Sequence, residues 1–142
     1  MRNLAVVAVL AATVGACATD IGPTPAELKS TWQSQNVYPA GYKSDLLAFF
    51  RTYLNDPTHV RSASVSQPQL KLAGPNEPGE RYMVCVRYTA RDSAGHYTAP
   101  KEGAATFVSG KLDRFLDLPR EVRELCKDAV FAPFPELGKL AR

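Results

Sequence analysis

The N-terminal segment sets where this chain folds and therefore which bonds can hold it together. Met1-Arg2-Asn3 carries positive charge, and residues 4–14 form an unbroken run of apolar and small side chains. A run of this length matches the apolar core of a secretory signal, about 7–15 residues, and is too short for a membrane-spanning helix of about 20. It ends in Val14-Gly15-Ala16-Cys17. The pattern predicts an export signal, and therefore that the rest of the chain folds in an oxidising compartment.

The residues before Cys17 resemble the lipobox of bacterial lipoproteins, in which an aliphatic residue and two small residues precede a cysteine. Val14 stands where Leu is usual. The resemblance implies a diacylglyceryl group on the Cys17 sulfur, cleavage before it and acylation of the new N-terminus, and two or more acyl chains hold a protein stably on a membrane. Ala18, in place of a retention Asp, implies the cell outer membrane, facing the periplasm. The alternative is an ordinary cleaved signal with a cysteine nearby by chance.

The length and charge of the chain limit the number of domains and the classes of partner that are expected. The chain has 142 residues, with 17 Lys and Arg against 14 Asp and Glu, which suits one domain. A formal charge of +3 without basic blocks argues against nucleic acid as a partner. We predict a signal peptide over residues 1–16, a lipidated tether that includes a short helix over 17–43, and a single α+β domain over 44–142.

Two cysteines remain once Cys17 is assigned to lipid. Cys85 and Cys126 are an even pair in an exported chain, which favours a disulfide. The helical stripe that carries Cys126 suits a bond from a closing helix to a central strand. The alternatives are a redox or nucleophilic pair, for which His59 and His96 are the only candidate bases, and two separate buried thiols.

Two helices are predicted in the first part of the exported chain. Thr24 and Glu27 have the spacing of a capping box, which predicts a short helix through about residue 33. Trp32 lies near the end of this helix, and three placements are considered for it: docked on the domain, at the bilayer interface, or against a partner. A wide apolar stripe of helical period predicts a second helix over residues 45–54, with one face packed on the core.

The hydrophobic period then changes to two, which predicts strands. They are expected over residues 59–66, 81–90, 104–109 and 111–116. The second is apolar on both faces and is therefore placed at the centre of the sheet. A helix is expected from about residue 119 to 129, and an extended apolar strap over 131–137. The sequence thus predicts an α+β fold: an antiparallel three- to four-stranded sheet with an N-terminal and a C-terminal helix packed on it.

Residues 50–100 resemble a class of small exported bacterial proteins of unassigned function. That class has a D-P segment after a helix, then C-x-x-x-N-A-[KR]-N-x-x-G-x-Y. The matching positions here are Asp56, Pro57, Cys85, Ala90, Arg91, Gly95 and Tyr97. Thr89 and Asp92 stand where the pattern has Asn. The resemblance implies that the proteins are related, but it implies no particular activity.

The stretch 87–101 mixes cationic and aromatic side chains around a glycine turn. Its candidate binding residues are Arg87, Arg91, His96, Tyr97 and Lys101. They form either a rim for an anionic or glycan partner, or a tight hairpin in which Tyr97 covers the core. The sequence leaves both interpretations open.

No motif for catalysis, metal or cofactor binding is found. Isolated histidines lack further ligands at metal spacing, and nucleophile and phosphate-loop signatures are absent. Charges over residues 120–124 are expected to be solvated on a helix face. The expected function is a lipid-anchored binding or scaffolding module, not an enzyme, whose partner is an envelope protein, peptidoglycan or a lipopolysaccharide component. The alternatives are an inhibitor that inserts the loop 74–79 into an exported enzyme, and a small envelope enzyme using His96 with Asp92 or Arg91.

Overall fold

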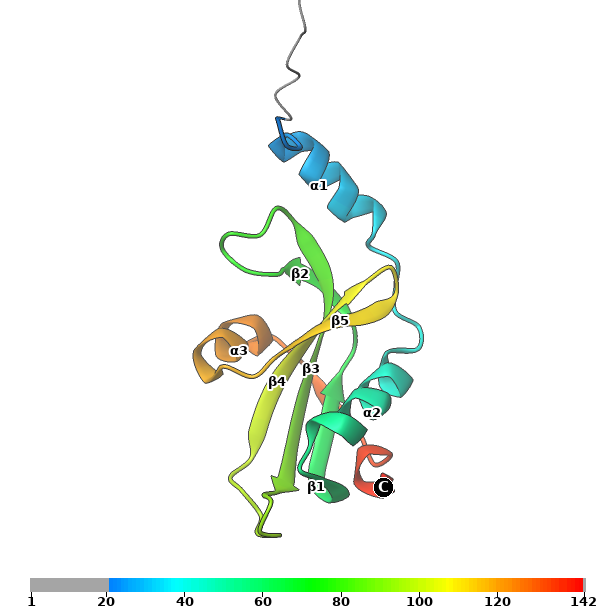
Figure 1. Cartoon of the computed structure of the whole chain (residues 1–142), viewed down its shortest axis with the longest axis vertical. Coiled ribbons are helices and arrows are strands. Elements are labelled where there is room, and N and C mark those ends of the chain that lie inside the picture. Colours follow the sequence, from blue (N-terminus) through cyan, green and yellow to red (C-terminus); the bar gives the residue numbers. More distant parts are fainter. Residues whose placement is uncertain (1–20, 142) are drawn as a thin grey trace, which may run out of the picture.

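The computed structural model describes residues 21–141, so Cys17 and the expected cleavage site lie outside it. Figure 1 shows one antiparallel sheet with helices on its two faces. The helices are α1 (Pro25–Ser34), α2 (Tyr42–Tyr53) and α3 (Pro119–Cys126), with a 3-10 turn, η1 (Leu137–Lys139). The strands are β1 (Asp56–Ser66), β2 (Gln69–Leu72), β3 (Glu80–Arg91), β4 (Lys101–Val108), β5 (Lys111–Leu116) and β6 (Phe131–Pro133).

The fold is α+β and its sheet is antiparallel, as predicted, but the sheet has more strands than expected. Its order is β5-β4-β3-β1-β6, and β2 pairs with the first residues of β3. The prediction of three to four strands is wrong because β2 and β6 pair as well, which makes six. These two strands have four and three residues and lack a clear alternation of buried and exposed positions, so the sequence gives no strand signal for them.

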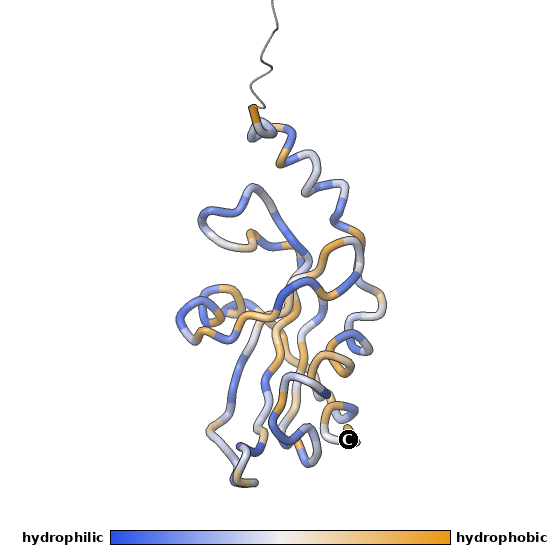
Figure 2. The backbone as a smooth tube through the Cα atoms, in the orientation of Figure 1, coloured by the Kyte–Doolittle hydropathy of each residue, from blue (hydrophilic) through white to orange (hydrophobic). Residues whose placement is uncertain are grey.

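β3 is the central strand, because each of its faces is covered by a different helix. Val84, Val86 and Tyr88 alternate with Met83 and Cys85 along it, and all five are buried. The first set packs with α2 and the chain end in one core cluster, whereas the second packs with α3 in another. Figure 2 shows the hydrophobic residues gathered on the central strands. The double apolar pattern of β3 was therefore correctly interpreted.

The helices differ from the predicted arrangement in place. The strongly amphipathic stripe over residues 45–54 does form α2, which buries Leu46 and Phe50 completely. α3 lies on the opposite face of the sheet and does not close the chain, since β6 and η1 follow it. The tail, expected as an extended strap, pairs β6 with β1 and then buries Leu137.

The short helix predicted before the domain is α1, and its capping box between Thr24 and Glu27 is present. α1 has no buried residue and is held at its C-terminal end. There the Arg81 guanidinium lies 3.7 Å from the Trp32 ring centre, donates to the Trp32 carbonyl at 2.9 Å and to Gln35 Oε1 at 2.8 Å. Of the three placements considered for Trp32, docking on the domain is the one observed.

Cys85 of β3 and Cys126 of α3 lie at disulfide-bonding distance, with Cα atoms 5.9 Å apart. Both are buried in the α3-side cluster. The predicted link from the central strand to the following helix is therefore present in the structure.

Between residues 21 and 141, no helix combines the length and the apolarity that a bilayer crossing requires.

Candidate binding face

The face of the sheet that α3 partly covers carries most of the candidate residues. Arg87, Thr89 and Arg91 follow Cys85 at two-residue steps on β3, so all project from the α3 side. Their cross-strand partners share this face: on β1 these are Ser64, Arg61 and Asp56, and on β4 Glu102 faces Arg87. α3 packs beside Cys85, and beyond it the face is charged.

Each arginine of this face lies against an aromatic ring. The Arg61 guanidinium is 3.9 Å from the Tyr97 ring centre, and that of Arg91 is 5.0 Å from the same ring. Arg87 lies 3.8 Å from the Phe131 ring centre. Such cation–π contacts hold a guanidinium in place while its N–H groups stay available. We call Arg61, Arg87, Arg91, Tyr97 and Phe131 the arginine face.

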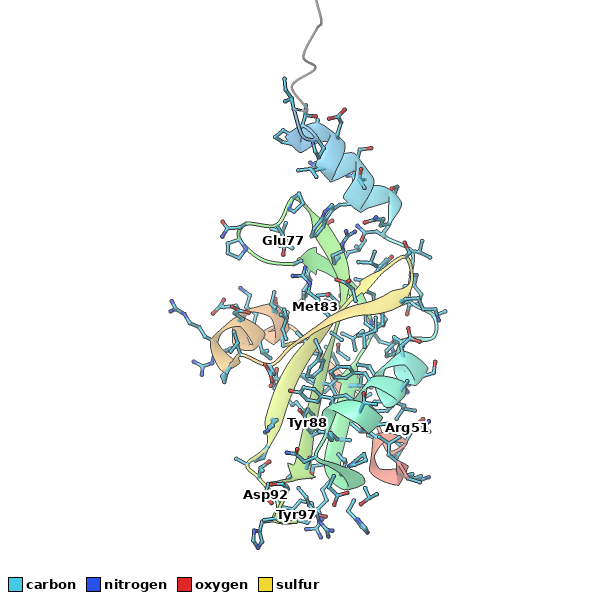
Figure 3. All side chains as sticks on the ribbon, viewed as in Figure 1. Arg51, Glu77, Met83, Tyr88, Asp92 and Tyr97 are labelled. Atoms are coloured by element: carbon cyan, nitrogen blue, oxygen red, sulfur yellow. A yellow bond between two sulfur atoms is a disulfide. The ribbon has the colours of Figure 1, made fainter. Side chains whose placement is uncertain are left out.

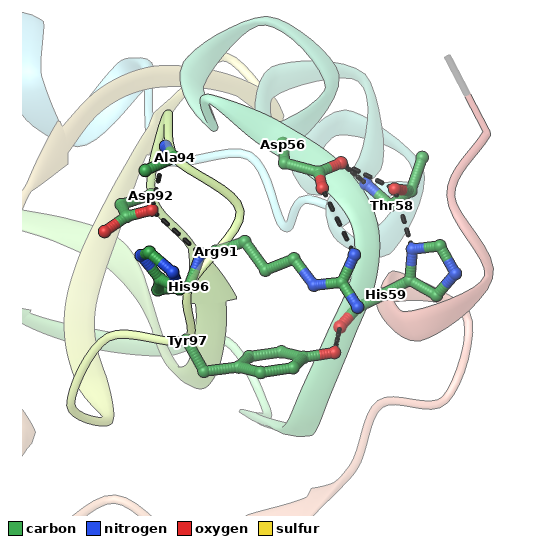
Figure 4. A network of polar contacts seen from close by, with 8 residues as sticks. All are labelled: Asp56, Thr58, His59, Arg91, Asp92, Ala94, His96 and Tyr97. Atoms are coloured by element: carbon green, nitrogen blue, oxygen red, sulfur yellow. Dashed lines mark hydrogen bonds and ion pairs between the residues drawn. The ribbon is translucent and has the colours of Figure 1, made fainter.

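A polar network fixes the end of this face (Figure 4). An Asp56 oxygen lies 3.9 Å from Arg91 Nη1, and its other oxygen accepts from the Thr58 amide at 3.0 Å. The Tyr97 hydroxyl donates to the His59 carbonyl at 2.9 Å. The D-P segment and the R-x-x-x-G-x-Y segment, which the sequence links only by resemblance, thus form one structural unit.

The start of β1 is irregular, and this irregularity presents Arg61. His59 and Ser62 have φ angles of 61° and 51°, in the left-handed region that non-glycine residues rarely adopt. The pairing of β1 with β3 shifts register on both sides of Arg61. The register shifts that bring Arg61 beside Tyr97 are set by strand pairing, so the sequence marks Arg61 only as a member of an expected strand.

The turn after β3 is organised by Asp92. Its Oδ1 accepts from the amides of Ala94 and His96, both at 2.9 Å, and Gly95 adopts a φ of 83°, which glycine permits. These bonds, first the one from His96, lower the pKa of the Asp92 carboxyl. The turn is tight, and Tyr97 after it contacts two arginines and lies outside both core clusters.

We expect the amide proton shifts of Ala94 and His96 to titrate with a midpoint below 3.8, the ordinary pKa of Asp92. A carboxyl whose folded pKa is lowered stabilises the turn above its unfolded pKa, and this contribution is lost as the pH falls through the folded pKa. NMR shifts recorded through the acid range give the midpoint. Asp92→Asn should abolish the transition, and a midpoint at or above 3.8 would contradict the assignment.

The structure separates the five candidate residues into two groups and one outlier. Arg91 and Tyr97 meet in the network above. Arg87 and Lys101 meet instead at a hollow beside α3. His96 is exposed and lines neither of the two hollows described here. Figure 3 shows Asp92 and Tyr97 at the end of the molecule far from Glu77.

The loop 74–79 packs back on the domain. Glu77 accepts from Arg114 at 3.2 Å, and the Gly79 Cα lies close to the Trp32 side chain, so that a Cβ there would be 3.5 Å from the Trp32 Cβ. The loop also lines the second hollow, about 570 Å³, with Arg120 and Leu125 of α3. These contacts give no specific support to an inhibitory loop.

Within the described residues, no group of three His, Cys, Asp or Glu side chains is placed to hold a metal ion. No protein-family model, curated protein or solved structure gives a significant match to this chain.

Proposed function

We propose that this chain is a lipid-anchored protein of the bacterial cell envelope that acts as a binding or scaffolding module and uses the arginine face as its contact surface. The residues before Cys17 support the lipid anchor, and Ala18, in place of a retention Asp, supports the outer membrane with the domain in the periplasm. The observation that carries the contact surface is the Tyr97 ring, which lies against both Arg61 and Arg91.

The arginine face suits a partner that carries carboxylate or phosphate groups. A guanidinium ordered on a ring loses little freedom on binding and offers paired N–H donors to such groups. Arg61 is exposed, and about half of the Arg87 side chain remains exposed in spite of its 2.8 Å ion pair with Glu102. Both arginines are therefore accessible to a partner.

The position of the face agrees with a tether at the N-terminus. Figure 1 shows α1 at one end of the long axis and the β3–β4 connection at the other. Tyr97 and Arg91 are at that second end. A domain held through the segment before α1 therefore presents these residues away from the membrane.

The contact surface is tested by crosslinking in cells. We expect the full chain to capture a partner with a membrane-permeable crosslinker, and Arg61→Gln with Arg87→Gln to lose most of that capture, because both charges leave the face. The matched control is Arg51→Gln with Lys139→Gln, two exposed cations on α2 and η1. Mass spectrometry identifies the partner. Equal capture of the partner by the two double variants, or no capture by the native chain, would contradict the proposed contact surface.

The anchor is tested separately. Cys17→Ser removes the acyl acceptor, so we expect the chain to move from the membrane fraction to the soluble fraction, since two or more acyl chains are what hold it. Immunoblots of fractionated cells and the intact mass of the purified native chain measure this. A variant that stays in the membrane fraction contradicts the lipid anchor. The crosslinking experiment still tests the contact surface in that case.

A further inference from the structure

A basic hollow lies between α3 and the β3–β4 part of the sheet. Its volume is about 520 Å³, within the range of about 300–1,000 Å³ typical of small-molecule sites. Its charged lining consists of Arg87, Lys101, Glu102, Asp117, Arg123 and Lys127. We call it the basic groove.

The carboxylates of the groove are already engaged. Glu102 is paired with Arg87 at 2.8 Å, and one oxygen of Asp117 accepts from the Tyr53 hydroxyl at 2.5 Å. Lys101, Arg123 and Lys127 form no ion pair with any residue of the 21–141 segment. Three cations that have no ion-pair partner in the described segment therefore line one hollow.

Helix α3 by itself explains only part of this arrangement. Arg123 is in its last turn and Lys127 is its C-cap, where cations are favoured by the helix dipole. Lys101, however, belongs to β4 and pairs with Tyr88, so it starts from the α2 side of the sheet and yet lines the same hollow. The dipole gives no reason for a third cation, from another element, to line this hollow.

We propose that the basic groove binds a phosphomonoester attached to a sugar-sized body. Four cations and two carboxylates leave a formal charge of +2, which matches the charge of about −1.5 to −2 that a phosphomonoester carries at pH 7. Arg123 offers a planar fork and the two lysines offer point charges, a combination that suits phosphate oxygens. The inference goes beyond the proposed function: Arg87 belongs to both surfaces, but the groove requires neither the anchor nor Arg61, Arg91 or Tyr97.

The groove has room and groups for more than the phosphate. Pro100, Pro119 and Ala129 give it apolar walls, and Asp117, which also lines the hollow, has a second oxygen that can accept from a hydroxyl group. Burial, together with the bond to Asp117, raises the pKa of Tyr53, so the Tyr53 hydroxyl stays protonated and keeps donating. The link between Cys85 and Cys126 fixes α3 against β3, so the two walls are held at a set distance before a ligand arrives.

Calorimetry on the purified full chain at low ionic strength tests the site with glucose 1-phosphate, a free sugar phosphate, and with soluble dihexanoyl phosphatidic acid, a lipid headgroup. Glucose and inorganic phosphate are the controls. We expect a phosphomonoester to bind more tightly than inorganic phosphate and glucose not to bind. Tighter binding of glucose 1-phosphate assigns a soluble ligand, and tighter binding of phosphatidic acid assigns a lipid.

The variant Arg123→Gln with Lys127→Gln should weaken this binding by about tenfold or more, because charge-assisted hydrogen bonds to the phosphate oxygens are lost. The matched control, Arg120→Gln with Lys139→Gln, removes the same charge; Arg120 is on the same helix but faces the second hollow. Thermal unfolding confirms that both variants fold. Equal affinity of the two variants, equal binding of inorganic phosphate, or no binding of either phosphomonoester overturns the proposal.

Discussion

Removal of the Cys85–Cys126 link should lower the free energy of unfolding by about 4 kcal/mol. The cysteines are 41 residues apart, and closing a loop of that size in the unfolded chain gives this figure in the chain-entropy model. For a domain whose total stability is about 5–15 kcal/mol, the loss is a large share. The link also joins α3 to β3 within the α3-side cluster. Once it is removed, we expect α3 to detach before the sheet unfolds.

Urea unfolding with and without dithiothreitol measures this effect. The Cys17→Ser chain is used so that the third thiol takes no part. Cys85→Ala with Cys126→Ala provides the control, because its unfolding midpoint should no longer respond to the reductant. An unlinked pair of thiols would show itself as a midpoint that is the same in both conditions, together with labelling of both cysteines in the unreduced protein.

Phe50→Ala is expected to lower the free energy of unfolding by about 3–5 kcal/mol, the usual cost of truncating a buried phenylalanine. Phe50 is fully buried, and its ring centre lies 5.0 Å from Tyr88 and 5.4 Å from Phe115. The ring therefore connects α2 to both β3 and β5. Without it, a cavity remains that rigid strands fill poorly.

Leu72→Ala is the reference for this substitution. Leu72 is 62% exposed on β2, and exposed substitutions usually change stability by less than about 0.5 kcal/mol. Chemical denaturation of both variants gives the comparison. A Phe50→Ala variant as stable as Leu72→Ala would mean that α2 does not pack on the sheet as described.

The elements that the sequence predicts well are those whose pattern is long enough to show a period. The stripe of α2 and the double apolar alternation of β3 each extend over twelve residues, so local sequence alone indicates type and burial. β2 and β6 are stabilised by pairing with β3 and β1, and this pairing is set by the tertiary fold. Short strands of this kind carry no periodic signal of their own.

The candidate site shows the same division. Arg91 and Tyr97 could be selected because they flank a glycine turn in one continuous stretch. Arg61 could not, since the register shifts of β1 bring it to Tyr97. Arg123 was expected to be solvated charge on a helix face; it is exposed, yet it lines the basic groove. The approach of α3 to β4 that creates this groove is a tertiary contact without a local sequence signal.

The weak seating of α1 has a mechanical consequence. A domain tethered at its N-terminus and bound to a partner at the arginine face is loaded in tension between these points. With the proposed anchor and contact surface both engaged, we expect α1, which buries no residue, to separate and unwind before the sheet unfolds. Its ten residues span about 15 Å as a helix and about 33 Å when extended. We therefore expect the proposed tether to gain reach toward its partner while the sheet stays folded.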